Sequence, residues 1–185
     1  MAHRLIACTP VSRWILIMSA QVSQQEVKFP RVFNPHRQIA GGASQLAISA
    51  VVNADRYRIF QALTVPEYME AWLCLPGDAR HQVSALRNTN GYRIEFRGPL
   101  AHGVSVAGTY MVFRRSKVVF TWQKDTGDAQ PSFVLIRLHG EFSRTRLCLY
   151  HIGLRSQEDH QWHQTMWESS LAALSSLFKQ GTNGF

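Results

Sequence analysis

Apolar and polar side chains alternate with a period of two along most of residues 81–154, which is the pattern of half-buried β-strands. In GYRIEFRG, at 91–98, Tyr92, Ile94 and Phe96 therefore lie on one face and the charged side chains on the other. Short turn signals separate the runs, so we expect an antiparallel meander with one buried face and one face in water. The six runs are HQVSALR, GYRIEFRG, GVSVAGTYMVFRR, KVVFTWQK, SFVLIRLHGEF and TRLCLYHIGL.

Helix signals precede these runs. A β-rich run, LAISAVV at 46–52, opens the domain, and Asn53 or Asp55 can cap a helix that starts directly after it. Pro66 begins a second short helix, since proline is tolerated in a first helical turn. The sequence thus predicts one strand and two short helices before the meander.

The chain closes with a predicted helix from about Glu158 to Lys179. Acidic residues at its start and a lysine at its end suit the helix dipole. Small residues beside its apolar stripe allow close approach to a sheet or leave room next to it. The stripe consists of Trp167, Leu171, Leu174 and Phe178.

An α+β fold accounts for this order of elements. A curved antiparallel sheet of about seven strands, wrapped around the terminal helix, buries the apolar faces of both. Such an arrangement commonly leaves a cavity between sheet and helix, and a pocket for an apolar ligand is expected there.

We expect one domain, at residues 46–180, because 185 residues suffice for one full core. Residues 1–45 are interpreted as a flexible leader, since the stretch 19–45 is rich in Gln, Ser, Pro and Gly. Residues 181–185 form a short tail in this interpretation.

The first 20 residues leave three interpretations open. Pro10 and Arg13 divide the apolar stretch, so no run approaches the ~20 apolar residues of a membrane span. Residues 1–17 are an over-long start with translation beginning at Met18, a disordered or loosely docked tail, or an export signal with a charge inside its apolar region.

Half of the formal net charge of +8 lies in residues 1–45, and the other half is spread over the remaining 140 residues. Arg114, Arg115 and Lys117 form its one close cluster, at a predicted turn, and a solvated turn explains that cluster. Nucleic-acid readers usually gather their charge into a stripe on a helix or loop. We therefore expect no nucleic-acid partner.

Three cysteines, Cys8, Cys74 and Cys148, are far apart and show no C-x-x-C spacing. This usage favours a reducing compartment over a disulfide or zinc framework. The sequence therefore predicts a cytoplasmic protein.

Four motifs in order resemble a known family over about 135 residues. They are IFQALTVPEYMEAW at 59–72, Gly108 and Tyr110 followed by VVFTW at 118–122, TRLCLYHIGL at 145–154, and MWESSLAAL at 166–174. Together they resemble the SRPBCC (START-like, helix-grip) superfamily, and within it the proteins similar to the activator of the heat-shock-protein-ninety ATPase. The resemblance implies a helix-grip fold and, as one possibility, a protein-binding module.

The chain departs from the family pattern at three places. Val65 replaces the usual aspartate before Pro66, and RRS at 114–116 replaces the usual DPP turn. Met166 replaces the glycine before Trp167, which puts a flexible thioether where the family leaves space. We therefore expect the cavity near the helix to be smaller or differently shaped.

Aromatic residues supply the candidate ligand site. Phe120 and Trp122 share a strand face with Val118, and such a stripe forms plain core or the wall of a cavity. His151 alternates with leucines and points inward, either hydrogen-bonded within the core or placed for a ligand's polar end or for proton transfer. The candidate ligand-binding residues are Trp72, Tyr92, Phe96, Tyr110, Phe120, Trp122, His151, Met166, Trp167, Ser170 and Leu174.

Other polar residues suggest no further chemistry. His160 and His163 are three apart on the terminal helix, but no third ligand is apparent, so we expect a surface pair and no metal site. Glu95 and Glu141 are isolated and expected to face solvent. The sequence contains no G-x-S-x-G, phosphate loop or dinucleotide fingerprint, so hydrolase, nucleotidase and dinucleotide-binding functions lack support.

Three functions stay open. The first is a binder of an apolar or amphipathic small molecule, without catalytic residues or cofactor. The second is a protein-interaction module whose partner is a chaperone or another protein, as the resemblance implies. The third is an enzyme similar to polyketide cyclases and aromatases, with His151 and Tyr110 or Tyr150 as acid and base. A monomer and a homodimer fit equally well.

Overall fold

The computed structural model describes residues 44–75, 81–85, 90–97, 104–125 and 130–179. The first two of these residues belong to the predicted leader, and the rest of that leader and the predicted tail lie outside them.

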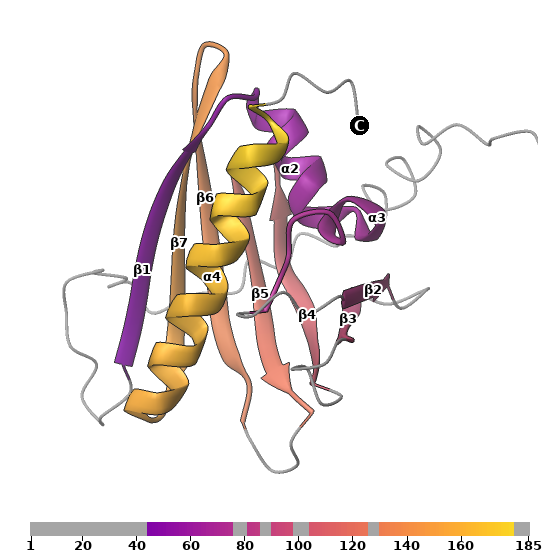
Figure 1. Cartoon of the computed structure of the whole chain (residues 1–185), viewed down its shortest axis with the longest axis vertical. Coiled ribbons are helices and arrows are strands. Elements are labelled where there is room, and N and C mark those ends of the chain that lie inside the picture. The colour runs from indigo at the N-terminus through magenta and orange to yellow at the C-terminus, as the bar shows by residue number, and fades with distance from the viewer. Residues whose placement is uncertain (1–43, 76–80, 86–89, 98–103, 126–129, 180–185) are drawn as a thin grey trace, which may run out of the picture. The chain divides into compact units, whose positions relative to one another are not determined.

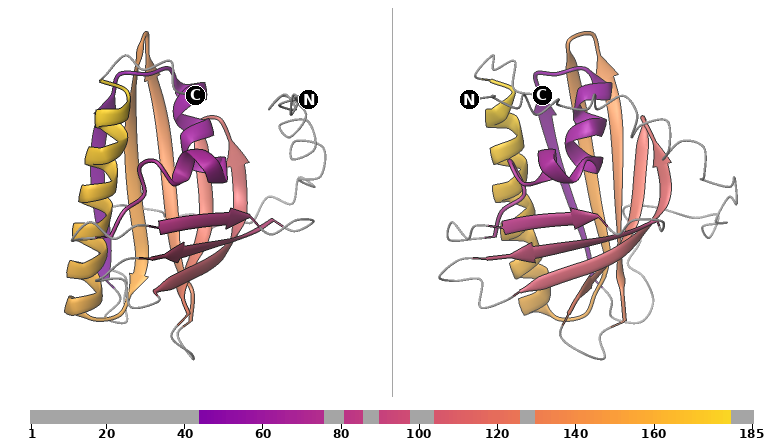
Figure 2. Two further views of the ribbon diagram at one scale, coloured as in Figure 1. Left: turned by 45° about the vertical axis from the view of Figure 1, so that its right-hand side comes forward. Right: turned by 90° about the vertical axis from the view of Figure 1, so that its right-hand side faces the viewer.

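Seven strands form one antiparallel sheet in the order β1-β7-β6-β5-β4-β3-β2 (Figure 1). In Figure 2 the short strands β2 and β3 run across the direction of β6 and β7, so the sheet is strongly curved. The α+β fold class and the predicted seven-stranded sheet are confirmed. The strands are β1 (Ser44–Val52), β2 (His81–Ala85), β3 (Gly91–Phe96), β4 (Ser105–Arg114), β5 (Lys117–Lys124), β6 (Ser132–Glu141) and β7 (Arg144–Leu154).

The long helix α4 (Gln157–Leu177) packs on the inner face of the sheet, along β1 and β7 (Figure 1). Ser156 caps it by accepting a hydrogen bond from the Asp159 backbone N–H at 3.0 Å. The side chains of the predicted apolar stripe are buried, as are several neighbours on the same side of the helix. The buried residues of the helix are His163, Met166, Trp167, Ser170, Leu171 and Leu174.

Two short helices, α2 (Arg56–Thr64) and α3 (Pro66–Met69), follow β1 as predicted. The Asp55 side chain caps α2 by accepting hydrogen bonds from two backbone N–H groups of its first turn. After α3 the buried Trp72 indole donates to the Ala62 carbonyl at 2.8 Å, which ties the turn back onto α2.

Because Gly108 on β4 has no side chain, the Tyr92 side chain on β3 can reach across β4 to β5. Gly108 lies opposite Tyr92 in the pairing of β3 with β4, and the Tyr92 hydroxyl passes over it to donate to the Thr121 carbonyl on β5 at 2.6 Å. Any Cβ at position 108 would overlap that carbonyl oxygen and lie 2.7 Å from the Tyr92 ring. This crossing fixes one end of the aromatic face described next.

Candidate functional site

A continuous run of aromatic rings lies on the inner face of strands β3, β4 and β5 and reaches α4 at Trp167. Ring centroids are 5.8 Å apart for Tyr110 and Phe120, 6.3 Å for Phe120 and Trp122, and 5.0 Å for Trp122 and Trp167 of α4. Tyr92 lies against both Tyr110 and Phe120. These tilted and edge-on contacts are the favoured geometries of aromatic pairs. The structure thus brings five of the predicted site residues together.

His151 lies at one end of this run and is fully buried. The Trp167 indole N–H donates to its Nδ1 at 3.1 Å, and because an indole can only donate, Nδ1 must be an unprotonated acceptor. Nε2 then carries the proton and donates to the Ser132 hydroxyl at 2.7 Å, which donates in turn to the Trp122 carbonyl at 2.9 Å. Both nitrogens of His151 are therefore occupied by protein groups.

Electrostatics keep His151 neutral. Burial lowers the pKa of its imidazole well below the ordinary value, and the neighbouring His163 and Lys124 lower it further. Burial also raises the pKa of the Tyr110 hydroxyl, which stays protonated. A neutral histidine with both nitrogens engaged is a poor general base, so this arrangement favours a structural role for His151.

His163 was expected on the surface, and that expectation is wrong, because its side chain is only 2% exposed. It lies one helical turn before Trp167, on the same stripe of α4, with its ring centroid 4.5 Å from that of His151. Nδ1 contacts the Asp159 carbonyl oxygen at 2.7 Å and a carboxylate oxygen of the same residue at 3.1 Å. Both partners are acceptors, so Nδ1 holds the proton and Nε2 presents a lone pair.

Two buried nitrogens at the centre of this cluster lack a hydrogen-bond partner among the residues that the structure describes: Trp122 Nε1 and His163 Nε2. The first is a donor and the second an acceptor, and their ring centroids are 6.4 Å apart. Leaving a buried polar group unpaired costs about 1–3 kcal/mol, so such groups call for an explanation. A hydroxyl group can satisfy both, because it accepts from one and donates to the other.

The comparison with protein families decides where the chain belongs. A family model described as "Activator of Hsp90 ATPase homolog 1-like protein" matches residues 53–179. The chain belongs to this family. The resemblance inferred from the four sequence motifs is thereby confirmed, whereas no curated protein matches the chain.

Solved structures share the fold of this family member at low sequence identity. Protein CV1439 from Chromobacterium violaceum is 18% identical, with a TM-score of 0.65 over 73% of this chain and 96% of that one. CalU16 from Micromonospora echinospora is also 18% identical, with a TM-score of 0.54 over 75% of this chain and 78% of that one. DynU16, from the dynemicin biosynthetic locus, is 18% identical, with a TM-score of 0.59 over 75% of this chain and 48% of that one. At such identities the likeness shows the fold alone.

The remaining predicted site residues of this family member lie elsewhere in the core. The Ser170 hydroxyl donates to the Cys74 carbonyl and accepts from its backbone N–H, both at 3.1 Å, which holds the segment after α3 against α4. The Trp72 indole is bonded within the α2–α3 unit, as described above. The others are fully buried apolar side chains: Phe96, Met166 and Leu174.

Sequence reasoning missed two members of the cluster. His163 could have been found, because it lies four residues before Trp167 and so shares its helix face. Ser132 carries no local signal, since its link to His151 depends on the pairing of β6 with β7. Among the described residues there is no group of three metal-ligating side chains, and no helix with the length and apolar character to cross a bilayer.

The buried histidines of this family member predict a loss of stability in acid. Burial, more than any other influence, lowers the pKa of His163 to about 4 from an ordinary 6.5. Between these two pH values the unfolded chain binds a proton that the folded chain does not. The free energy of unfolding therefore decreases by about 1.4 kcal/mol for each unit by which the pH is lowered. The His163→Phe variant lacks this proton and should show a slope shallower by that amount in urea titrations from pH 7 to 4. Identical slopes would contradict the assignment.

Proposed function

We propose that this protein binds an apolar or amphipathic small molecule between the inner face of the sheet and α4. The observation that carries the proposal is a pair of buried nitrogens without a hydrogen-bond partner in the described part of the chain, Trp122 Nε1 and His163 Nε2, which lie where the aromatic run meets α4. The aromatic rings favour a ligand with an apolar body. A hydrogen-bond donor beside an acceptor favours a hydroxyl group at the polar end of that ligand.

The expected affinity follows from burial. A ligand that removes some 200–300 Å² of apolar surface from water gains roughly 5–7 kcal/mol, before the loss of translational freedom. A hydroxyl that pairs both nitrogens removes an unfavourable contribution already present in the free protein. Binding in the micromolar range is the expected result, and no catalytic step needs to follow it.

The test is a fluorescence and thermal-shift titration with ligand pairs that differ only at the polar end, such as an aryl or alkyl alcohol and its methyl ether. The ether has no proton to donate to His163, so the alcohol should bind the wild type about tenfold more tightly. In Trp122→Phe and His163→Phe that preference should shrink, while the matched variant Trp162→Phe should keep it. Trp162 is a stringent control because its ring centroid lies 4.8 Å from that of His163, while its replacement removes neither of the two nitrogens that would bind the hydroxyl.

The proposal fails if no member of the panel changes tryptophan emission or raises the melting temperature. A protein-interaction module then takes its place as the function. Phe142, fully exposed in the turn between β6 and β7, is an aromatic side chain that such a module could present to a partner. The three cysteines are far apart and show no C-x-x-C spacing, which supports our further proposal that the protein works in the cytoplasm.

A further inference from the structure

Like charges face one another across three neighbouring strands on the outer side of the sheet. Arg114 on β4 is the pairing partner of Lys117 on β5, and Lys117 is in turn the partner of Arg137 on β6. Directly opposed side chains share a face and lie close together, and like charges in that position destabilise a sheet. This row of three cations, Arg114, Lys117 and Arg137, therefore destabilises the sheet electrostatically, and the packing of the core does not require it.

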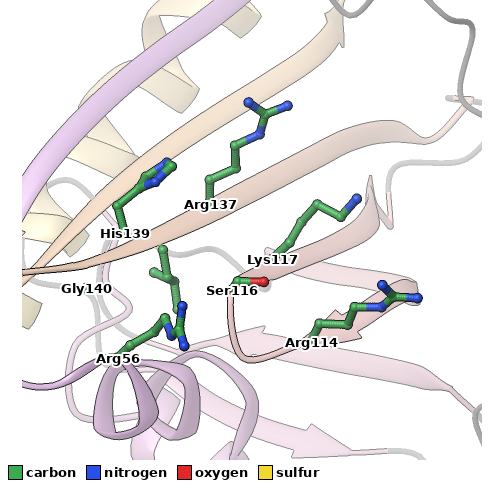
Figure 3. A pocket seen from close by; sticks show the side chains of 8 residues that line it. Arg56, Arg114, Ser116, Lys117, Arg137, His139 and Gly140 are labelled. Atoms are coloured by element: carbon green, nitrogen blue, oxygen red, sulfur yellow. The ribbon is translucent and has the colours of Figure 1, made fainter.

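Two further basic groups converge on the same place. Arg56, in the first turn of α2, and His139, two residues beyond Arg137, line a hollow of about 580 Å³ together with this row (Figure 3). The Ser116 hydroxyl in the β4–β5 turn adds a hydrogen-bonding group to its wall. The basic side chains that line the hollow thus come from the start of one helix and from three strands.

The nearby acidic groups do not neutralise the hollow. The Asp55 carboxylate is engaged in capping α2, and Glu141 pairs with Arg146 at 3.3 Å. None of the four permanently charged groups of the hollow has an ion-pair partner among the described residues. The positive field is therefore available to a ligand.

We propose that this hollow is a binding site for a compact polyanion that carries two or more phosphate groups. Guanidinium groups match phosphate oxygens in paired hydrogen bonds, and the lysine adds a point charge. A concavity of this size suits a small molecule, whereas proteins that bind nucleic acids usually carry their positive charge in a stripe. This site is separate from the proposed ligand site in the interior, so the two proposals are tested independently.

The experiment titrates the full chain with inorganic tripolyphosphate at low salt, using calorimetry and the melting temperature as readouts. The Lys117→Gln and Arg137→Gln variants should each bind about tenfold more weakly, since each removes charged hydrogen bonds. Arg155→Gln is the matched control: it removes the same charge from the exposed residue that follows β7 and should change affinity less than twofold. Bound tripolyphosphate should raise the melting temperature of the wild type.

A second readout does not depend on binding. Because the row repels itself, Lys117→Gln should melt at a temperature equal to or above that of the wild type in low salt without any anion. The proposal is overturned if tripolyphosphate does not bind, or if Arg155→Gln weakens it as much as Arg137→Gln does, which would indicate nonspecific attraction to a basic protein. It is also overturned if a poly-glutamate peptide or an oligonucleotide binds while tripolyphosphate does not.

Discussion

Replacing Gly108 by alanine is expected to destabilise the domain by more than about 3 kcal/mol, enough to prevent folding in a marginally stable protein. The added Cβ would overlap the Thr121 carbonyl oxygen and press on the Tyr92 ring at 2.7 Å. The obstacle on one side is strand backbone, so β4 and β5 must separate or Tyr92 must give up its hydrogen bond. Urea denaturation monitored by tryptophan fluorescence measures the loss.

Gly140 provides the control for this prediction. A Cβ there meets its nearest neighbour, the Cβ of Arg56, at 3.7 Å, which is an ordinary contact. Gly140→Ala should therefore change the free energy of unfolding by less than about 1 kcal/mol. Similar losses at the two glycines would show that the Tyr92 crossing does not set the cost.

Truncating Trp167 to alanine should cost about 3–5 kcal/mol, whereas the same change at Trp162 should cost about 1 kcal/mol. Trp167 is 1% exposed, packs on Trp122, and donates the hydrogen bond that sets the tautomer of His151. Trp162 is half-buried, and its ring lies 3.7 Å from the Lys124 ammonium group.

Chemical denaturation of the Trp167→Ala and Trp162→Ala variants measures the two losses in the free energy of unfolding. Trp167→Phe refines the result, because it keeps most of the ring but removes the donor to His151 Nδ1. It should lie between the wild type and the alanine variant. Equal losses at Trp162 and Trp167 would mean that α4 presents a different face to the sheet.

Local sequence patterns predict most of the fold because they reflect local physics. The period of two in GYRIEFRG places Tyr92, Ile94 and Phe96 inside, and all three are buried. Asp55 was one of two candidate caps, and its side chain does cap α2. The family motifs add the topology, which alternation alone leaves open.

The polar part of the candidate site depends on contacts between distant segments. His163 was assigned to the surface because no third metal ligand is apparent beside it and His160, although its spacing from Trp167 places it on the buried stripe. Ser132 reaches His151 only because β6 pairs with β7 in one register. Arg137 lies 20 residues from Lys117 in sequence, and the pairing of β5 with β6 is what makes them direct neighbours. Periodicity within one segment cannot supply such information.

A ligand bound beneath α4 is proposed to place its polar end against Trp122 and His163. The chain has five tryptophans, and each gives one indole N–H signal in a nitrogen–proton correlation spectrum. Trp72 supplies an internal reference, since its N–H is already bonded to the Ala62 carbonyl. Single Trp→Phe variants assign the signals.

Titration of the labelled protein with the tightest alcohol of the panel is the most direct test. We expect the Trp122 indole proton to shift downfield to the position of a hydrogen-bonded N–H as the site fills, while the Trp72 signal stays in place. A Trp122 signal that does not move at saturating ligand, or a change confined to the half-buried Trp162, would contradict this expectation.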